Sequence, residues 1–416
     1  MYNVFLACLL VLLAPKTLRK RDKRRHAYRR CFLPKFHLPK QAIWIHGVSL
    51  GEVYAARPLI AAIKKEHPGI PIVLSSSTNT GMQAAESIKG LAASFLLPFD
   101  FSFLMRPLLR RLQPKTLLLI EGDYWKNLIY YTKKQNAKLF LVSGKMSLRS
   151  ARRLAKVPFW GRTIFTKFDG IFVQNQEYEK RFLQAGAPKD CVEVTGNIKY
   201  CASLPKLSDE EVTRWKRRFG MKEKELVITI GSTHFPEELL LLEKLLLLWK
   251  TFPQIKVLLA PRHPERFEEV ATLLREKKIP FAKYTKEKIS TEKPLILIDT
   301  MGLLATCYAV SDAAIVGGSY VDNIGGHNVL EPNFSGTPVF YGPFMHGQKD
   351  LAHLVENAKS GKVLQEHELV PFFTEYFACP KEKHRMKNAA TQLISSLDEN
   401  LAGTIQRFTE YGAFVR

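Results

Sequence analysis

Short apolar segments alternate with helical patterns along almost the whole chain of 416 residues. In the first half the apolar segments have the length of single strands, and helical patterns lie between them, as at 55–66 and 80–88. Near-continuous apolar strands separated by helices are typical of a parallel sheet that is covered on both faces. The strands expected in this half are 42–46, 70–75, 116–120, 138–142 and 170–173.

The alternation restarts after a loop at residues 201–212, with expected strands at 226–230, 256–260, 295–298, 313–316 and 338–341. A chain of this length exceeds one ordinary core. We therefore predict an α/β protein with two doubly wound, Rossmann-like domains and a ligand in the cleft between them. The predicted parts are an apolar and polybasic segment at 1–36, domains at 37–205 and 206–380, and a helix at 381–416 that packs back across both domains.

A glycine-rich loop, G-G-S-Y-V-D-N-I-G-G-H-N-V-L-E-P, runs from Gly317 to Pro332 after an expected strand. Its two glycine pairs let the backbone turn sharply and approach a ligand, because glycine has no Cβ. We expect a helix to open at its end, where free N–H groups suit phosphate. His327, Asn328 and Glu331 add hydrogen-bonding groups there.

Two further loops of the second half follow expected strands. One carries Pro261, Arg262 and His263, and arginine binds phosphate well in a bidentate manner. The other carries Met301, Gly302 and Leu303. Because three such loops converge on one sheet edge, we predict a nucleotide pocket. None of them is a P-loop or a G-x-G-x-x-G fingerprint, which disfavours ATP hydrolysis and NAD chemistry.

In the first half, acidic residues follow two expected strands. Glu52 lies in V-S-L-G-E at a helix start, where it can act as a general base or only complement the helix dipole. Glu121 and Asp123, in I-E-G-D-Y-W-K-N, either face the ligand edge of the sheet or cap the next helix. Lys199, in V-T-G-N-I-K-Y, can stabilise a departing phosphate or a carboxylate, although lone lysines are usually solvated.

The net charge of +23 implies an anionic partner, and its distribution indicates which one. An uncharged apolar run, 4–14, precedes a stretch at 16–30 with nine Lys or Arg against one Asp. The run is shorter than the roughly 20 residues that span a bilayer, and the order is the reverse of a signal peptide. It predicts attachment to an anionic cytoplasmic membrane surface, with the domains in the cytoplasm. The alternative is an amphipathic helix docked on the protein itself.

Metal and nucleic-acid sites are not indicated. The six cysteines form no C-x-x-C pair and have no nearby histidine partners, which argues against a metal site and against a disulfide framework. No recognised nucleic-acid module is present, although a basic nucleic-acid-binding protein is one alternative that salt-dependent duplex binding would test.

Taken in order, these motifs resemble those of 3-deoxy-D-manno-octulosonic acid (Kdo) transferases. The matching segments are H-G-V-S-L-G-E, I-E-G-D-Y-W-K-N, V-T-G-N-I-K-Y, I-G-S-T-H, P-R-H-P-E-R-F, D-T-M-G and the glycine-rich loop. The resemblance covers essentially the whole chain. It implies a GT-B fold and an inverting transfer of Kdo from CMP-Kdo to lipid A precursor (lipid IVA) at the bacterial inner membrane, adding one or more Kdo residues.

The resemblance also assigns residues. Glu52 matches the proton acceptor, and Glu121 and Lys199 match positions that stabilise the transition state. Pro261 and Arg262, Met301 to Leu303, and Asn328, Val329, Leu330 and Glu331 match the CMP-binding segments. It implies no metal in the transfer step, no cofactor and no nucleic-acid partner. It places the acceptor site in 37–205 and the donor site in 206–380.

This chain departs from the family pattern at three places. Asp123 replaces a glutamate, Leu303 stands where an acidic residue is usual, and the segment after Pro343 differs from the common H-x-F-N-F type. Another GT-B enzyme that uses a UDP-sugar is the nearest alternative, and competition by CMP against UDP separates the two.

Overall fold

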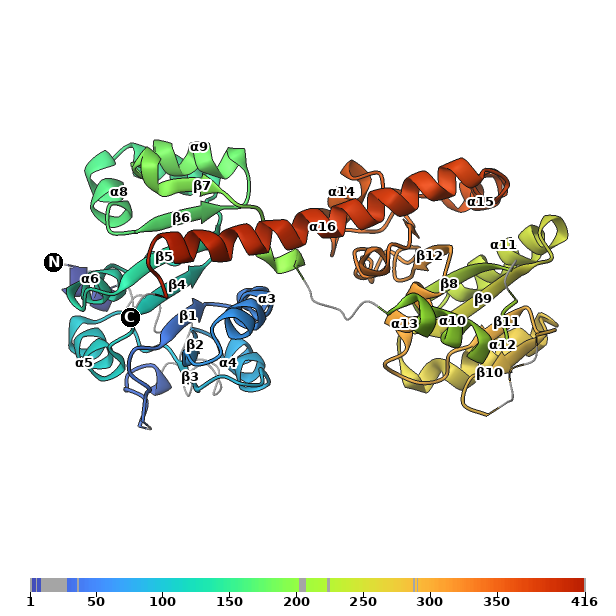
Figure 1. Cartoon of the computed structure of the whole chain (residues 1–416), viewed down its shortest axis with the longest axis horizontal. Coiled ribbons are helices and arrows are strands. Elements are labelled where there is room, and N and C mark those ends of the chain that lie inside the picture. The colour runs from blue at the N-terminus through green and yellow to red at the C-terminus, as the bar shows by residue number, and fades with distance from the viewer. Residues whose placement is uncertain are drawn as a thin grey trace. The chain divides into compact units, whose positions relative to one another are not determined.

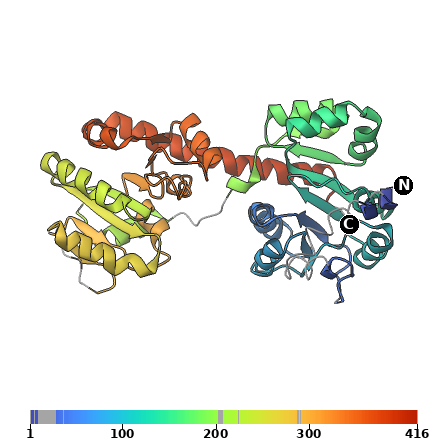
Figure 2. The same cartoon turned by 180° about the vertical axis from the view of Figure 1, so that it is seen from behind.

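The computed structural model describes residues 2–4, 6–8, 28–35, 37–201, 207–222, 225–286, 289 and 291–414. Its contacts divide the chain into two compact units. Unit 1 comprises Met1–Ser203 and Leu397–Arg416, and unit 2 comprises Leu204–Ser396. Each unit is an α/β structure with helices on both faces of its sheet (Figures 1 and 2).

Unit 1 contains a seven-stranded sheet in the order β3-β2-β1-β4-β5-β6-β7, in which every strand pair is parallel. Its strands are β1 (Ile43–Gly47), β2 (Ile72–Ser76), β3 (Ala93–Leu96), β4 (Thr116–Ile120), β5 (Lys138–Gly144), β6 (Gly170–Val173) and β7 (Val192–Val194). Its helical elements are α3 (Leu50–Glu66), α4 (Asn79–Glu86), α5 (Ser102–Leu112), α6 (Lys126–Lys134), α7 (Leu148–Ala155), α8 (Pro158–Phe165), α9 (Gln176–Gln184), η1 (Lys189–Cys191) and η2 (Ile198–Tyr200).

Unit 2 contains a second seven-stranded parallel sheet, in the order β10-β11-β9-β8-β12-β13-β14. Its strands are β8 (Leu226–Thr233), β9 (Ile255–Pro261), β10 (Phe281–Lys283), β11 (Leu295–Leu297), β12 (Ala313–Val316), β13 (Val339–Tyr341) and β14 (Gly361–Val363). Its helical elements are α10 (Asp209–Arg218), α11 (Glu237–Thr251), η3 (Pro264–Arg266), α12 (Phe267–Glu276), α13 (Leu304–Ala309), η4 (Pro332–Ser335), α14 (Lys349–Asn357), η5 (Glu366–Glu368), α15 (Leu369–Ala378) and most of α16 (Pro380–Glu410).

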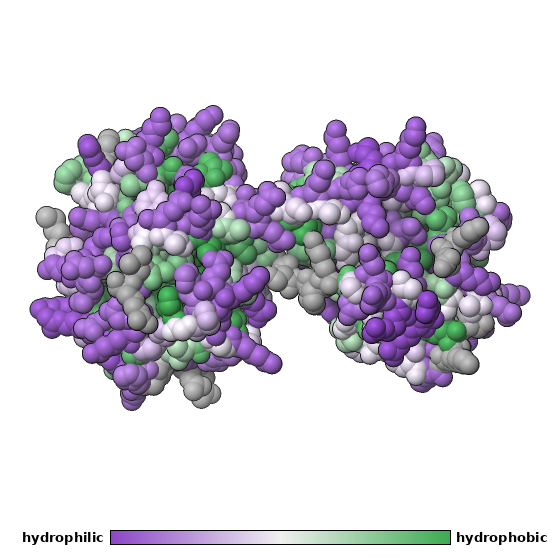
Figure 3. Space-filling model, viewed as in Figure 1, coloured by the Kyte–Doolittle hydropathy of each residue, from purple (hydrophilic) through white to green (hydrophobic). Residues whose placement is uncertain are grey.

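The central strands are buried along their whole length, which explains their near-continuous apolar sequences. β1 and β4 of unit 1 and β9 and β12 of unit 2 are buried at every position. Helices cover both faces of such a sheet, so neither face needs polar side chains. Polar residues therefore concentrate on the surfaces of the units, which are mostly hydrophilic in the view of Figure 3.

The long helix α16 contributes to both cores. Met386, near its start, packs in the core of unit 2. The residues from Leu397 onward belong to unit 1, where the ring of Phe408 lies 5.2 Å from that of Phe140 and 5.4 Å from that of Phe172. The chain after the helix is held to the same unit, because the Thr116 hydroxyl donates to the carbonyl of Ala413 at 2.6 Å.

The parallel α/β architecture predicted from the sequence is confirmed in each unit. Among the expected strands, 116–120, 170–173 and 313–316 have the observed bounds, and the others shift by one to three residues at their ends. The short edge strands β3, β7, β10 and β14 were not predicted. The helix expected at the end of the glycine-rich loop is only the 3-10 turn η4.

Most of the proposed N-terminal anchor, residues 4–14, and most of the polybasic stretch lie outside the described residues. In the described part of the chain, no helix is long and apolar enough to cross a membrane. Tyr2 and Asn3 are held to the rest of unit 1: the Tyr2 hydroxyl donates to Asp100 at 2.9 Å, and the Asn127 amide donates to Asn3 at 2.8 Å. Burial raises the pKa of Asp100 to about 6.

We predict that Phe408→Ala lowers the free energy of unfolding of unit 1 by about 3–5 kcal/mol, because it removes a fully buried ring and leaves a cavity. Denaturant unfolding, with hydrogen exchange of β5 and β6 as a local readout, measures the loss. Phe159→Ala is the matched control, since Phe159 is 78% exposed in the same unit and its loss changes stability by only about 0.5 kcal/mol. Equal effects of the two substitutions would contradict the packing of α16 in this core.

Candidate functional site

In unit 1 the chain leaves the neighbouring strands β1 and β4 in opposite directions across the sheet. Such a topological switch point leaves a crevice at the carboxyl ends of the strands, where open α/β sheets bind ligands. Glu52 lies in the first turn of α3, directly after β1, and Glu121 directly follows β4. The fold therefore brings these two predicted site residues to the same point.

The carboxylate of Glu52 is held by the turn that starts α3. Ser49 caps the helix by accepting from the Glu52 backbone N–H at 3.4 Å. In return Glu52 accepts from the Val48 backbone N–H at 2.6 Å and from the Ser49 hydroxyl at 3.1 Å. A Cβ on Gly47 would lie 3.1 Å from the backbone and Cβ of Glu52, so this close turn favours glycine there.

Burial raises the pKa of Glu52, and the negative charge of Glu121 raises it further, against the lowering effect of the Val48 hydrogen bond. A carboxylate with a raised pKa is a stronger base than an ordinary surface glutamate. The surroundings of Glu52 therefore suit a general base, and its carboxylate also accepts hydrogen bonds at the start of the helix.

Glu121 is only 7% exposed and forms an ion pair with Lys145, which follows β5. The Lys145 backbone N–H also donates to the carbonyl of Glu121 at 2.9 Å. The backbone here is strained, because Glu121, Asp123 and Ser143 all have left-handed φ angles, of +63°, +73° and +51°. Non-glycine residues with such angles are uncommon and gather at functional sites.

Asp123 is tied to its surroundings by the Trp125 indole N–H, which donates to it at 2.6 Å. Its carboxylate also lies 3.8 Å from Nε2 of His46, a buried residue at the end of β1. The other ring nitrogen of His46 lies 2.8 Å from the Ser75 hydroxyl. His46 and Lys145 were not singled out from the sequence, although His46 stands in the H-G-V-S-L-G-E motif.

Lys199 lies in η2 and is exposed, with its ammonium group 6.0 Å from the centre of the Tyr200 ring. The Ile198 backbone N–H donates to the Ser143 hydroxyl at 3.0 Å, and η2 also packs against α3. This packing fixes the backbone of Lys199 beside the helix that carries Glu52, while its side chain stays in solvent.

Unit 2 has its switch point between β8 and β12. There the buried carboxylate of Glu237, at the start of α11, accepts backbone N–H bonds from His234 at 2.7 Å, Gly318 at 2.6 Å and Tyr320 at 3.3 Å. A Cβ on Gly317 would approach Glu237 Oε1 to 2.6 Å. Glu237 therefore fixes the start of the glycine-rich loop to the loop after β8, and glycine is needed where they meet.

Histidine and arginine side chains gather beside this clamp. The Nε2 atoms of His234 and His327 lie 2.7 Å apart, and their rings are stacked at 17°. The His263 ring stands edge-on to that of His234, with 5.3 Å between their centres. Burial lowers the pKa of His327 to about 4, and the nearby charges of His234, Arg262 and His263 add to this effect.

The segments predicted to bind CMP begin at the same edge of the sheet, because each of them ends or follows one of its parallel strands. They differ in what they can offer a ligand. Arg262, Met301 and Asn328 are exposed, Gly302 has a left-handed φ of +89°, and Leu303 caps α13.

Pro261 is buried at the end of β9, and the side chains of Val329 and Leu330 are also buried, so these three residues can offer a ligand only their backbone. The Asn328 side chain accepts from the Leu330 backbone N–H at 3.0 Å and thus shapes its own loop. Burial raises the pKa of Glu331, while the charge of Arg262 lowers it. Arg262 and Glu331, predicted from separate motifs, are therefore close enough for the charge of one to affect the pKa of the other.

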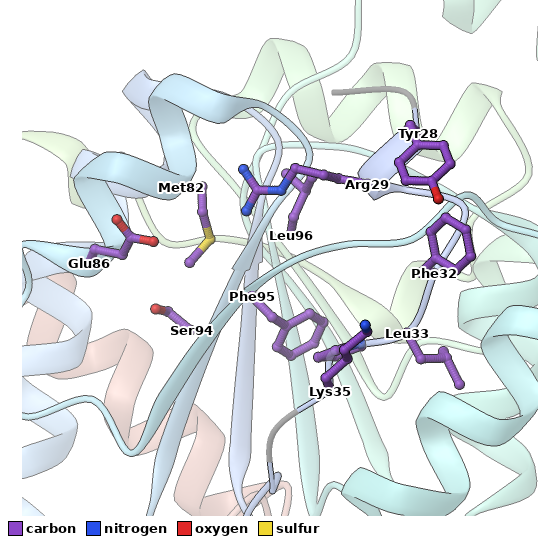
Figure 4. Close-up of a pocket in the computed structure, with 11 residues that line it drawn as sticks. Tyr28, Arg29, Phe32, Leu33, Lys35, Met82, Glu86, Ser94, Phe95 and Leu96 are labelled. Atoms are coloured by element: carbon purple, nitrogen blue, oxygen red, sulfur yellow. The ribbon is translucent and has the colours of Figure 1, made fainter. Parts of the chain in front are cut away.

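A separate pocket of about 430 Å³ lies in unit 1, between the segment before β1 and the outer strand β3 (Figure 4). Its lining combines apolar, aromatic and charged side chains, namely Tyr28, Arg29, Phe32, Leu33, Pro34, Lys35, Met82, Glu86, Ser94, Phe95 and Leu96. The β2 strand separates β3 from β1, so this pocket is distinct from the surroundings of Glu52.

No group of three His, Cys, Asp or Glu side chains within the described residues is arranged to hold a metal ion. The six cysteines, all of them described, are free thiols.

Comparisons with known proteins agree with the ordered motifs. A family model for 3-deoxy-D-manno-octulosonic-acid transferase (kdotransferase) matches residues 21–202. The chain is 33% identical over 343 residues to the 3-deoxy-D-manno-octulosonic acid transferase of Chlamydophila psittaci, covering 82% of this chain and 78% of that protein. It is 34% identical over 310 residues to the Haemophilus influenzae protein of the same name, covering 73% and 71% of the two chains. The chain belongs to the Kdo transferase family.

Membership of this family confirms the resemblance drawn from the motifs, and it makes the protein a glycosyltransferase. A solved structure, UDP-GlcNAc 2-epimerase from Neisseria meningitidis bound to UDP-GlcNAc, is similar in fold, with a TM-score of 0.55, 14% identity and coverage of 88% of this chain and 99% of that chain. At this identity the likeness concerns the fold alone. The C-terminal CMP-Kdo binding domain of WaaA from Acinetobacter baumannii matches 44% of this Kdo transferase and 96% of its own length, at 27% identity and a TM-score of 0.42.

We predict that Glu52→Gln makes this Kdo transferase more stable at neutral pH. Because the folded pKa of Glu52 is raised, its contribution to stability is fully present below the unfolded pKa and is lost as the pH rises through the folded pKa. Glutamine cannot ionise, so the gain in stability of Glu52→Gln should be seen at neutral pH, where Glu52 is ionised. It should vanish below about pH 4, where Glu52 is protonated. Thermal unfolding at several pH values measures it, and an equal gain at all pH values would contradict the burial of an ionised Glu52.

Proposed function

We propose that this protein transfers Kdo from CMP-Kdo to a lipid A precursor, with inversion at the anomeric carbon and with Glu52 as the general base. The observation that supports the proposal is the environment of the Glu52 carboxylate. This carboxylate has a raised pKa and lies beside Glu121 at a topological switch point. The chain that carries it belongs to the Kdo transferase family. We further propose that the two α/β units together make up a GT-B fold, as the family resemblance implies.

In the proposed reaction Glu52 takes the proton of an acceptor hydroxyl as the oxygen attacks the anomeric carbon of Kdo. The bond between that carbon and the phosphate oxygen breaks, and CMP leaves with the electron pair. Attack and departure on opposite faces of the sugar invert the anomeric configuration. General-base help of this kind typically contributes about 10²–10⁴-fold in rate.

Glu121 and Lys199 are proposed to stabilise the transition state. The carbon under attack acquires positive charge, which the buried carboxylate of Glu121 favours, and Lys145 holds that carboxylate in place. The exposed Lys199 can meet the carboxylate of Kdo or the departing phosphate. The proposal assigns the negative charge of the leaving group to Lys199 and Arg262 rather than to a metal ion, as the family resemblance implies.

The CMP group is proposed to bind in unit 2. Arg262 suits the phosphate because a guanidinium group offers paired N–H donors. The backbone around Gly302 and the segment from Asn328 to Glu331 suit the nucleoside, the first because nothing lies within 4 Å of a Cβ on Gly302. The buried side chains of Val329 and Leu330 anchor that segment to unit 2.

The pocket in Figure 4 supports a lipid acceptor. Phe32, Phe95, Leu96 and Met82 offer apolar contacts to an acyl chain, and its volume of about 430 Å³ lies within the usual range for ligand sites. Arg29 and Lys35, also in its lining, suit phosphate groups on the same molecule.

Attachment to an anionic inner-membrane surface, with both units in the cytoplasm, is also proposed. A basic and apolar surface around α7 and α8 supports it. Residues 147–168 contain six Lys or Arg and no acidic residue, and Val157, Phe159 and Trp160 are exposed among them. Lys126 lies over the Trp160 ring at 5.1 Å and over the Tyr2 ring at 5.8 Å, which joins this surface to the start of the chain. Exposed aromatic rings beside basic residues suit a membrane interface.

The enzyme should form a Kdo-glycolipid from CMP-Kdo and lipid A precursor, and Glu52→Gln should lower kcat by about 10²–10⁴-fold. Mass spectrometry of the product measures both the reaction and the number of Kdo residues added. Glu66→Gln is the matched control, because Glu66 is exposed at the other end of the same helix.

Absence of product with the unaltered enzyme would overturn the proposed function. Full activity of Glu52→Gln would overturn the assignment of the base. Inhibition by UDP rather than by CMP would instead favour a UDP-sugar donor.

Exchange of Phe159 and Trp160 together for serine should weaken binding to vesicles rich in anionic lipid by roughly tenfold or more, because two large apolar groups no longer enter the interface. Sedimentation with vesicles, compared with neutral vesicles, measures the change. Leu246 and Leu247 of α11 are also exposed, so their exchange for serine is a matched control. If both double variants bind vesicles equally, this surface is not the membrane contact.

A further inference from the structure

The contact between His234 and His327 joins two loops that are 93 residues apart in the chain. His234 follows β8, and His327 lies in the glycine-rich loop after β12, so the pair sits at the switch point of unit 2. A Cβ on Gly318 would lie 3.0 Å from the His327 ring, so glycine is what allows this ring to lie against the loop. The backbone of unit 2 is thus shaped to bring the two histidine rings together.

A distance of 2.7 Å between two Nε2 atoms is that of a hydrogen bond, so one nitrogen carries the hydrogen and the other accepts it. The ring that donates still has a free lone pair on Nδ1. A proton added there makes this ring an imidazolium and leaves the bond between the rings intact. Two protonated Nε2 atoms would instead oppose each other. The pair can therefore take up one proton, but not two, without coming apart.

The charges around the pair are mostly positive. Arg262 and His263 follow β9, and Arg266 lies in η3. Burial, followed by the charges of His263, Arg266 and Arg262, lowers the pKa of His234. Burial, followed by the charges of His234, Arg262 and His263, lowers the pKa of His327. Two acidic groups are already engaged: Glu237 accepts backbone N–H bonds, and Glu238 pairs with Arg266 at 2.7 Å. A third acidic group, Glu331, has its pKa raised by burial and lowered by the charge of Arg262.

We propose that His234 and His327 act as one proton-sharing unit that receives the phosphate of the nucleotide donor and takes up a proton as the donor binds. This rests on the proposed CMP-Kdo donor and deepens it. Without ligand, burial and the cationic neighbours favour the neutral pair. A phosphate placed beside Arg262 cancels their charge, so the pair gains a proton and presents a charged N–H to the anion. When CMP departs with its added negative charge, the same proton stabilises it.

The test is calorimetric binding of CMP to the full chain in two buffers with different ionisation enthalpies, which counts the protons taken up. At about pH 6 we expect the unaltered protein to take up as much as about one proton more than the His234→Gln/His327→Gln double variant. The double variant also measures the proton exchange of the CMP phosphate itself, whose second pKa is about 6. Each single variant should bind CMP roughly tenfold or more weakly, since it loses a charge-assisted hydrogen bond.

Two comparisons separate this role from a structural one. If the histidines act as a pair, the double variant should bind no more weakly than the weaker single variant. His353→Gln is the matched control, because His353 is exposed on α14 in the same unit and should leave affinity and proton uptake unchanged. Weaker CMP binding with unchanged proton uptake in the single variants would overturn the proposal and leave the histidines as supports of the loop. Absence of CMP binding by the unaltered protein would overturn the proposed donor and this inference with it.

Discussion

Parallel strand pairing is the constraint on which both candidate sites depend. Because every paired strand within each sheet runs the same way, the loop after each strand emerges at the same edge. At one point in each sheet the chain turns to opposite sides, and the polar groups gather there. In unit 1 this point carries Glu52 and Glu121, and in unit 2 it carries His234 and the glycine-rich loop. The candidate sites are thus set by two positions in the topology.

The two switch points are built from different interactions. In unit 1 the carboxylates of Glu52 and Glu121 lie close together, and several residues in the turns around them have left-handed φ angles. Both features lower the stability of the fold, but the first of them makes the carboxylate of Glu52 more basic. In unit 2 a buried acid is instead satisfied by three backbone N–H groups, and cationic side chains gather beside it. The first arrangement suits removal of a proton and the second suits an anion, which is the division of work that glycosyl transfer needs.

The sequence predicted most strands of the sheets because a strand that is buried on both faces is apolar at nearly every position. Residues 116–120 and 313–316 are examples. It missed strands such as Val192–Val194, which are short and half exposed at the sheet edge. It also singled out Glu52 and Arg262 as candidate site residues, because Glu52 lies at the helix start after β1 and Arg262 directly follows β9. It could not identify Lys145 or the partner of His327, because neither has a local signal. Lys145 meets Glu121 only through the pairing of β4 with β5, and His327 meets His234 only through the pairing of β8 with β12.

The division of α16 between the two cores has a consequence for synthesis of the chain. Phe408 and the residues around it complete the core of unit 1, yet they are synthesised only after the whole of unit 2. Unit 1 therefore cannot finish folding before unit 2 has been synthesised, although its residues up to Ser203 emerge earlier. Unit 2 lies in the sequence between the two parts of unit 1, so all of it is available to fold before the core of unit 1 is complete. The half that emerges first is the half that matures last.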